Sequence, residues 1–293
     1  MMISYALSTC AFGGVIDEMT ADALRKGKFR QFELLFSTAP DGEVFSKFLQ
    51  EARKLVNEGV MTFSSSHMPF QNGNNWDVSC TDEYVRKYIV ANHIDLLRKN
   101  ADIIGRNVAV HASGEPPLDE HPVRMVQICR TLEDLMPIAD ELDLTFNIEY
   151  LPRTCLGNSV EELQAIVANF DKKRVGICLD VNHTMDRYAE LPDMINVLAE
   201  RINTFHISDY DGVDETHWIP GQGIINWSAV LQEIRKINHN VLLILETDMQ
   251  LKRLARKVDP VFALRQNERA VWFMENFDRL SAESAAFVIP GNN

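Results

Sequence analysis

Short apolar runs alternate with longer amphipathic segments about eight times along the chain. The runs are apolar on both faces, which is typical of parallel strands that are covered on both sides. They predict strands at residues 3–8, 32–36, 60–65, 108–110, 144–148, 175–179, 202–205 and 241–245. The amphipathic segments predict helices at residues 19–26, 43–58, 82–100, 123–142, 192–200, 227–237 and 261–280, with a further helix from residue 159.

Eight strand–helix units in 293 residues predict a single (β/α)8 TIM barrel, an α/β fold. The chain has no linker, shift of composition or low-complexity segment that would divide it. We therefore expect one domain over residues 1–293, with a loosely ordered tail at residues 281–293. The helix from residue 159 begins with Ser159 and Glu162, which form a capping-box pattern.

The composition and charge of the chain limit the kinds of molecule that it can bind. With 42 acidic and 29 basic residues the formal net charge is −13, which repels nucleic acid and anionic membranes. The first residues lack the pattern of a signal peptide, and no apolar run reaches the roughly 18–20 residues of a membrane span. Five scattered cysteines without a Cys-x-x-Cys pair indicate reduced thiols. We expect a cytoplasmic protein that acts on a small molecule. A homo-oligomer is compatible with this pattern.

Acidic residues and histidines stand at or just after the C-terminal ends of most predicted strands. They are Glu33, His67, His111, Glu149, Asp180, His183, His206 and Glu246. Of the eight histidines, five occupy such positions if His217, in the loop after the seventh strand, is counted. Because these strand ends converge on the face of a barrel that holds the active site, we expect the side chains to meet there.

A divalent metal ion is the simplest explanation for four of these residues. Glu149, Asp180, His206 and Glu246 follow the last four strands. Carboxylates that converge in a barrel mouth remain unsatisfied unless a positive charge neutralises them. Three carboxylates and one imidazole suit Mn²⁺, Mg²⁺ or Co²⁺, and the nitrogen ligand also admits Zn²⁺.

The motifs around these residues resemble the xylose isomerase-like barrel superfamily, which includes sugar phosphate isomerases and epimerases and endonuclease IV-type AP endonucleases. The matching segments are Phe-Asn-Ile-Glu at 146–149, Gly-Ile-Cys-Leu-Asp-Val-Asn-His at 176–183, Phe-His-Ile-Ser-Asp at 205–209, His-Trp-Ile-Pro-Gly-Gln-Gly at 217–223 and Leu-Ile-Leu-Glu at 243–246. The resemblance covers the whole chain and is strongest from 144 to 247. It implies that Glu149, Asp180, His206 and Glu246 bind one metal ion. It also implies that Glu149 and Glu246 are the acid–base pair.

The chemistry of such a site is consistent with this resemblance. A metal that binds adjacent carbonyl and hydroxyl oxygens acidifies the C–H bond between them and stabilises the enediolate that forms. One carboxylate removes the proton, and another returns it at the neighbouring carbon for isomerisation or at the same carbon for epimerisation. We expect a metal-dependent isomerase or epimerase of a sugar or sugar phosphate. Hydride transfer would need the same ligands and stays open.

Five further residues are predicted to contact the substrate: His67, His111, Arg153, His183 and His217. His183 follows Asp180 by three residues, so both can line one wall of the mouth. His217 could hold the substrate or a second metal ion. Arg153 could bind a substrate phosphate or carboxylate, with a surface salt bridge as the alternative.

Three other functions compete with this interpretation. A dehydratase of a cyclic polyol or keto-acid would use the same proton abstraction, followed by loss of hydroxide. A sugar-binding protein on a decayed barrel is disfavoured because all four predicted ligands are intact.

The third competitor is an endonuclease IV-type zinc phosphodiesterase, because ligand-competent residues stand at all nine metal-binding positions of that branch. Two departures weaken it: Glu215-Thr-His217 replaces Asp-x-His, and Tyr-Leu-Pro-Arg follows Glu149. The sequence also predicts no basic face for duplex DNA. The basic run at residues 252–257 is interpreted as the solvated side of a short helix.

Overall fold

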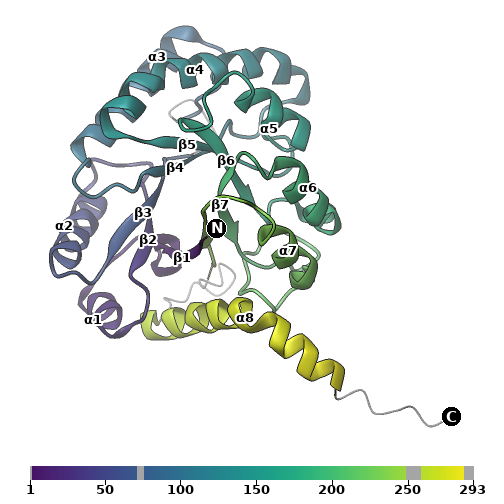
Figure 1. The fold of residues 1–293 in the computed structure, drawn as a ribbon. Helices are drawn as coiled ribbons and strands as arrows, with labels where there is room; N and C mark the ends of the chain where they lie inside the picture. The colour runs from purple at the N-terminus through teal and green to yellow at the C-terminus, as the bar shows by residue number, and fades with distance from the viewer. Residues whose placement is uncertain (1, 71–75, 249–258, 287–293) are drawn as a thin grey trace.

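The predicted barrel is confirmed by the computed structural model, which describes residues 2–70, 76–248 and 259–286. Eight parallel strands form one closed sheet in sequence order, and the first strand pairs with the last (Figure 1). The strands are β1 (Ile3–Ser8), β2 (Gln31–Leu35), β3 (Thr62–His67), β4 (Asn107–Val110), β5 (Thr145–Glu149), β6 (Val175–Asp180), β7 (Ile202–Ile207) and β8 (Val241–Leu245).

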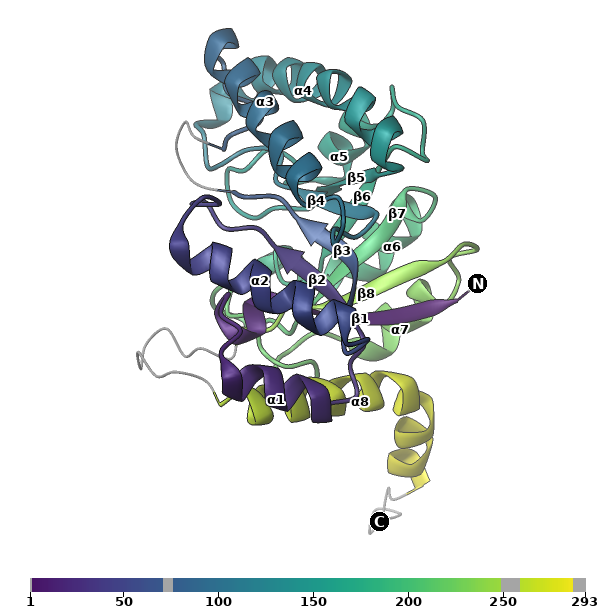
Figure 2. The ribbon, with the colours of Figure 1, turned by 90° about the vertical axis from the view of Figure 1, so that its left-hand side faces the viewer.

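Helices surround the barrel on its outer side (Figures 1 and 2). They are α1 (Glu18–Lys26), α2 (Glu43–Asn57), α3 (Glu83–Lys99), α4 (His121–Leu142), α5 (Val160–Val167), α6 (Leu191–Leu198), α7 (Trp227–Ile234) and α8 (Pro260–Ala286). Short 3₁₀ helices are η1 (Thr9–Phe12), η2 (Leu118–Glu120) and η3 (Met185–Glu190). Four of the α-helices have an N-cap residue whose side chain accepts a hydrogen bond from a backbone N–H group of the first turn. These N-cap residues are Asp17, Asp82, Ser159 and Asn226.

The strand ends differ from the prediction in one consistent way. His67, Glu149 and Asp180 are the last residues of their strands, whereas the apolar pattern placed them just after the strands. Strand pairing uses backbone groups, so a polar side chain does not end a strand whose neighbours continue. As a result these three side chains project from the sheet itself rather than from loops.

The predicted loosely ordered tail at residues 281–293 stays a prediction. α8 continues past Leu280 to Ala286, and residues 287–293 lie outside the described part of the chain. α8 packs against α1 and α7, which places the last helix beside the first (Figure 2).

The hydrophobic core lies mainly between the sheet and the helices, and the barrel interior is largely polar. Inside the barrel, Ala6, Leu242 and Ile244 form only a small apolar cluster. Lower in the barrel, Asn203 Nδ2 donates to Asn147 Oδ1 at 2.8 Å, and Asn147 Nδ2 donates to Asn107 Oδ1 at 3.3 Å.

Gly176 is the residue that gives these amides room. A Cβ atom at this position would lie 2.0 Å from Asn203 Nδ2 and 2.7 Å from Asn147 Oδ1. The lower interior is therefore neutral and closely packed beneath the charged upper end. Among the described residues, no helix is both long and apolar enough to cross a membrane.

Candidate active site

The C-terminal ends of the strands bring a cluster of acids and histidines into the mouth of the barrel. Glu33, His67, Glu149, Asp180 and His206 are completely buried there. Each comes from a different strand, and Glu246 follows directly after β8. The convergence that the sequence predicted for these residues is therefore present in the structure.

The four predicted metal ligands form one compact group. Glu149, Asp180, His206 and Glu246 each offer one donor atom, and these atoms all lie within 4.8 Å of one another. His206 Nδ1 lies 3.1 Å from Glu149 Oε1 and 2.9 Å from Glu246 Oε2. Separations of about 3 Å are those of adjacent ligands around an ion that each ligand binds at about 2.1 Å.

The hydrogen bonds of this group support a cation as the missing partner. Asp180 Oδ1 accepts bonds from the backbone N–H groups of Asn182 and His183 at 2.7 and 3.1 Å, which fixes the carboxylate. Its other oxygen, Oδ2, is buried and accepts no hydrogen bond from the described residues. Glu246 Oε2 is 2.9 Å from His206 Nδ1 but likewise accepts no hydrogen bond of ordinary geometry from the described residues. Buried carboxylate oxygens without donors are costly, so this donor set fits a divalent metal ion.

The electrostatics show how closely these groups are coupled. Burial alone lowers the pKa of His206, but the attraction of Cys178, Glu246 and Glu33 raises it well above its ordinary value. Burial raises the pKa of Glu149, and the neighbouring His206 and His111 outweigh it and hold that pKa well below normal. The cluster is thus held together by imidazolium–carboxylate attraction, and a metal ion would compete with the proton on His206.

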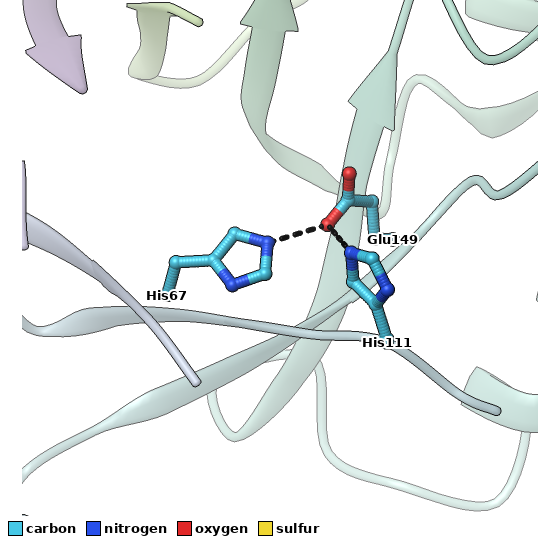
Figure 3. A group of neighbouring side chains, drawn as sticks. All are labelled: His67, His111 and Glu149. Carbon is cyan, nitrogen blue, oxygen red and sulfur yellow. Dashed lines mark hydrogen bonds and ion pairs between the residues drawn. The ribbon is translucent and has the colours of Figure 1, made fainter. Parts of the chain in front are cut away.

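His67 and His111 both contact Oε2 of Glu149, the carboxylate oxygen that does not face His206 (Figure 3). Their Nε2 atoms lie 3.0 and 3.2 Å from Glu149 Oε2, while Oε1 faces His206. The three residues form a second group with the spacing of metal ligands. The predicted contact of His67 and His111 with substrate stays a prediction.

A third group consists of Asp180, His183 and His217. Glu215 Oε1 lies 3.4 Å from His183 Nε2 and 3.8 Å from His217 Nε2. His183 and His217 therefore do line the mouth, as their spacing predicted. Whether they bind substrate stays a prediction.

The loop between β7 and α7 carries Glu215 and His217, and Asp209 organises it. The buried Asp209 carboxylate accepts bonds from the backbone N–H groups of Gly221 and Ile225 and from Trp227 Nε1, at 2.7, 3.1 and 2.8 Å. Gly221 has a φ of 91°, in the left-handed region that favours glycine. This network holds the loop over the mouth.

Arg153 lies at the rim of the mouth and already contacts three carboxylates. Its guanidinium is 2.8 Å from Glu215, 3.1 Å from Asp214 and 3.4 Å from Glu115. These contacts match the salt-bridge alternative, and the predicted role in binding a substrate anion stays a prediction. The basic run at residues 252–257 lies outside the described residues.

Three residues of the site received no role from the sequence. Glu33 Oε1 lies 3.2 Å from His206 Nε2, and a Glu within an apolar strand was the available signal. Glu215 was considered only for the nuclease alternative, as one of nine ligand-competent residues and as a departure from the Asp-x-His pattern. Phe70 stacks on His111, with ring centroids 4.1 Å apart, and lines a cavity of about 180 Å³ with His183 and Glu215. Nothing in the spacing indicated Phe70.

A closed (β/α)8 barrel with histidines and carboxylates at its mouth defines the class of this protein. The chain matches the xylose isomerase-like TIM barrel family over residues 21–265 and belongs to it. The resemblance that the motifs indicated is thereby confirmed.

The individual proteins that this chain resembles share at most 27% sequence identity with it in the three comparisons that follow. An uncharacterized protein of Methanocaldococcus jannaschii is 27% identical over 206 residues, which are 68% of each chain. D-psicose 3-epimerase of Enterocloster bolteae is 26% identical over 119 residues, 40% of this chain and 38% of the epimerase. The crystal structure of a D-tagatose 3-epimerase-like protein superposes with a TM-score of 0.72 at 21% identity, covering 93% of this chain and 98% of that one. This last similarity shows a shared fold.

Proposed function

We propose that this protein is a sugar epimerase or isomerase that requires a divalent metal ion and works by proton transfer. The observation that carries the proposal is the group of Glu149, Asp180, His206 and Glu246, with its donor atoms within 4.8 Å of one another. The similarity to D-psicose 3-epimerase supports a sugar as the substrate. Mn²⁺, Mg²⁺, Co²⁺ and Zn²⁺ all suit three carboxylates and one imidazole.

When bound, the cation would supply positive charge to the carbonyl and hydroxyl oxygens of the sugar. Glu149 ends β5 and Glu246 follows β8, so the two carboxylates enter the site from separate walls. Burial raises their pKa values, but nearby histidines, His206 first, hold both below the ordinary value. Both are then ionised at neutral pH. One can accept the proton from the carbon beside the carbonyl, and the other can return it.

The cavity beside this group would receive the rest of the substrate. Phe70 offers an apolar ring on one side, and His111, His183 and Glu215 offer hydrogen-bonding groups. A polyol has both a C–H face and hydroxyl groups, which suits a wall of this mixed kind.

The first experiment measures metal content and proton exchange together. We expect one Mn, Co, Mg or Zn per purified chain, lost or weakened in Glu246→Gln. Glu162→Gln is the matched control, because Glu162 pairs with His121 outside the metal group. A ketose panel in D₂O should then give an epimer or isomer that carries deuterium. Absence of metal after reconstitution would contradict the proposal, and a product without deuterium would point to hydride transfer.

The two other ligand groups favour a second candidate, a zinc phosphodiesterase. His67, His111 and Glu149, and separately Asp180, His183 and His217, have the spacing of metal ligands. Close to three zinc ions per chain and cleavage of DNA at an abasic site would establish this candidate. A dehydratase would use the proposed site itself, and a product that has lost water would reveal it. A cytoplasmic location and a homo-oligomer stay predictions.

A further inference from the structure

Glu33 approaches the proposed metal site from the far side of His206. It lies in β2, is completely buried, and has its Oε1 atom 3.2 Å from His206 Nε2. The other ring nitrogen, Nδ1, faces Glu149 and Glu246. The imidazole of His206 is thus held between Glu33 on one edge and the ligand group on the other.

This arrangement determines which nitrogen is free to bind an ion. A neutral imidazole carries one N–H group, and the hydrogen bond made by one nitrogen sets the role of the other. If Nε2–H donates to Glu33, Nδ1 presents its lone pair to the ligand group. A carboxylate that accepts from the remote N–H also makes the imidazole a stronger ligand.

The surroundings keep Glu33 and His206 in this orientation. Ser65 Oγ lies 3.0 Å from Glu33 Oε1 and can donate to it. The ring of His67 stacks on His206 with centroids 5.5 Å apart and an interplanar angle of 16°. Rotation of His206 is therefore restricted on its face as well as at its edge.

We propose that Glu33 is a positioning residue that selects the Nε2–H form of His206 and so sets the affinity of the site for its metal ion. The inference rests on the proposed function, because it assumes that His206 is a metal ligand. Glu33 itself does not touch the ion or the substrate in this role.

The test is a titration of the metal-free protein with Mn²⁺ alone. We expect Glu33→Gln to bind Mn²⁺ about 10–100-fold more weakly than the wild type, the usual effect of losing such a partner. Glu162→Gln is the matched control: it changes a His–carboxylate contact outside the metal group, 2.6 Å from His121, and should leave the affinity unchanged. Equal affinity of Glu33→Gln and wild type would overturn the inference.

Two further measurements separate positioning from a loss of folding. Ser65→Ala leaves both Glu33 and His206 in place and should weaken Mn²⁺ binding by about fivefold, the effect of losing the one hydrogen bond that Ser65 donates to Glu33. If Glu33→Gln does not fold, Ser65→Ala becomes the test of the inference. An Mn²⁺ affinity of Ser65→Ala equal to that of the wild type would then overturn it.

Nitrogen NMR of the Zn²⁺-loaded, ¹⁵N-histidine-labelled protein should show the proton of His206 on Nε2. A proton on Nδ1 in a protein that still holds Zn²⁺ would overturn the inference, because an Nδ1–H group cannot be the atom that binds the ion. Failure of the wild type to bind any metal would instead contradict the proposed function itself.

Discussion

The two ends of the barrel interior are both polar, yet they are built in opposite ways. At the lower end the amides of Asn107, Asn147 and Asn203 bond to one another. At the upper end, Asp180 and Glu246 each have a buried oxygen that accepts no hydrogen bond from the described residues. Polar groups that satisfy one another stabilise the fold, and groups left unsatisfied indicate a place for a ligand. This matches the usual division of a barrel into a stabilising lower face and an active upper face.

The largest effect should come from a substitution at the upper end. We expect Asp180→Asn to lose more metal affinity than the about 10–100-fold attributed to residues that only support a ligand. The same change should raise the unfolding free energy of the metal-free protein by about 1 kcal/mol, because burial outweighs the attraction of His183 and His217 and raises the pKa of Asp180, so that the fold disfavours the ionised carboxylate. Metal titration and urea unfolding measure the two effects. If metal-free Asp180→Asn is instead less stable than the metal-free wild type, Asp180 also stabilises the fold. The contrast between the lower and upper ends of the barrel would then not hold.

The corresponding substitution at the lower end of the barrel interior is Gly176→Ala. The new methyl group would have to displace Asn203 Nδ2, 2.0 Å away, and Asn147 Oδ1, 2.7 Å away. We expect the unfolding free energy to fall by about 3 kcal/mol through overpacking. Metal affinity of the folded fraction should not change. A large loss of affinity without loss of stability would show that the two ends are not independent.

His93 is a buried polar group outside both regions and sharpens the comparison. Its Nδ1 atom bonds to the Ile89 carbonyl at 2.8 Å, and Nε2 has no partner among the described residues. Burial lowers the pKa of His93 to about 4. Between pH 6.5 and about 4, His93 is therefore protonated in the unfolded chain but neutral in the folded chain. The unfolding free energy should therefore fall on acidification, by about 2.5 kcal/mol at about pH 4.5.

His93→Gln should lack this part of the pH dependence. Urea unfolding of both proteins from pH 7 to 4.5 isolates it, because contributions of the active-site groups cancel in the difference. Parallel curves for wild type and variant would show that His93 is already charged in the fold.

The smallest effect is expected at the rim. Arg153→Gln should lower the unfolding free energy by less than about 1 kcal/mol, since the side chain is 40% exposed and solvent screens its ion pairs. The same variant tests the predicted binding of a substrate anion. If Arg153 has that role, KM should rise for a phosphorylated ketose and not for the free ketose.

The sequence was sufficient for the barrel and for the convergence of Glu149, Asp180, His206 and Glu246, because both depend on strand order. Apolar runs mark strands, parallel strands end at one face, and the residues at those ends must converge. That Glu149, Asp180, His206 and Glu246 bind a metal ion also drew on the resemblance of their motifs, and it stays a prediction.

The role of Glu33 could not be read in this way. The register of β2 against β3 shifts between Phe32 and Glu33, and such an irregularity changes which side chains face inward. A similar shift beside β7 lies between Ile177 and Cys178. Phe70 and Glu215 lie on connections whose paths depend on contacts from elsewhere in the chain, such as those of Asp209 and Arg153.

The contact between Glu33 and His206 spans 173 residues of sequence. It exists only when the barrel has closed, with Ile3 of β1 paired to Val241 of β8. Contacts between such distant residues form late, because the chain must first lose the entropy of a very long loop. Tight metal uptake would then require a finished barrel, and a nascent or truncated chain would be left without it. In a cell, the metal ion would thereby distinguish completed molecules from incomplete ones.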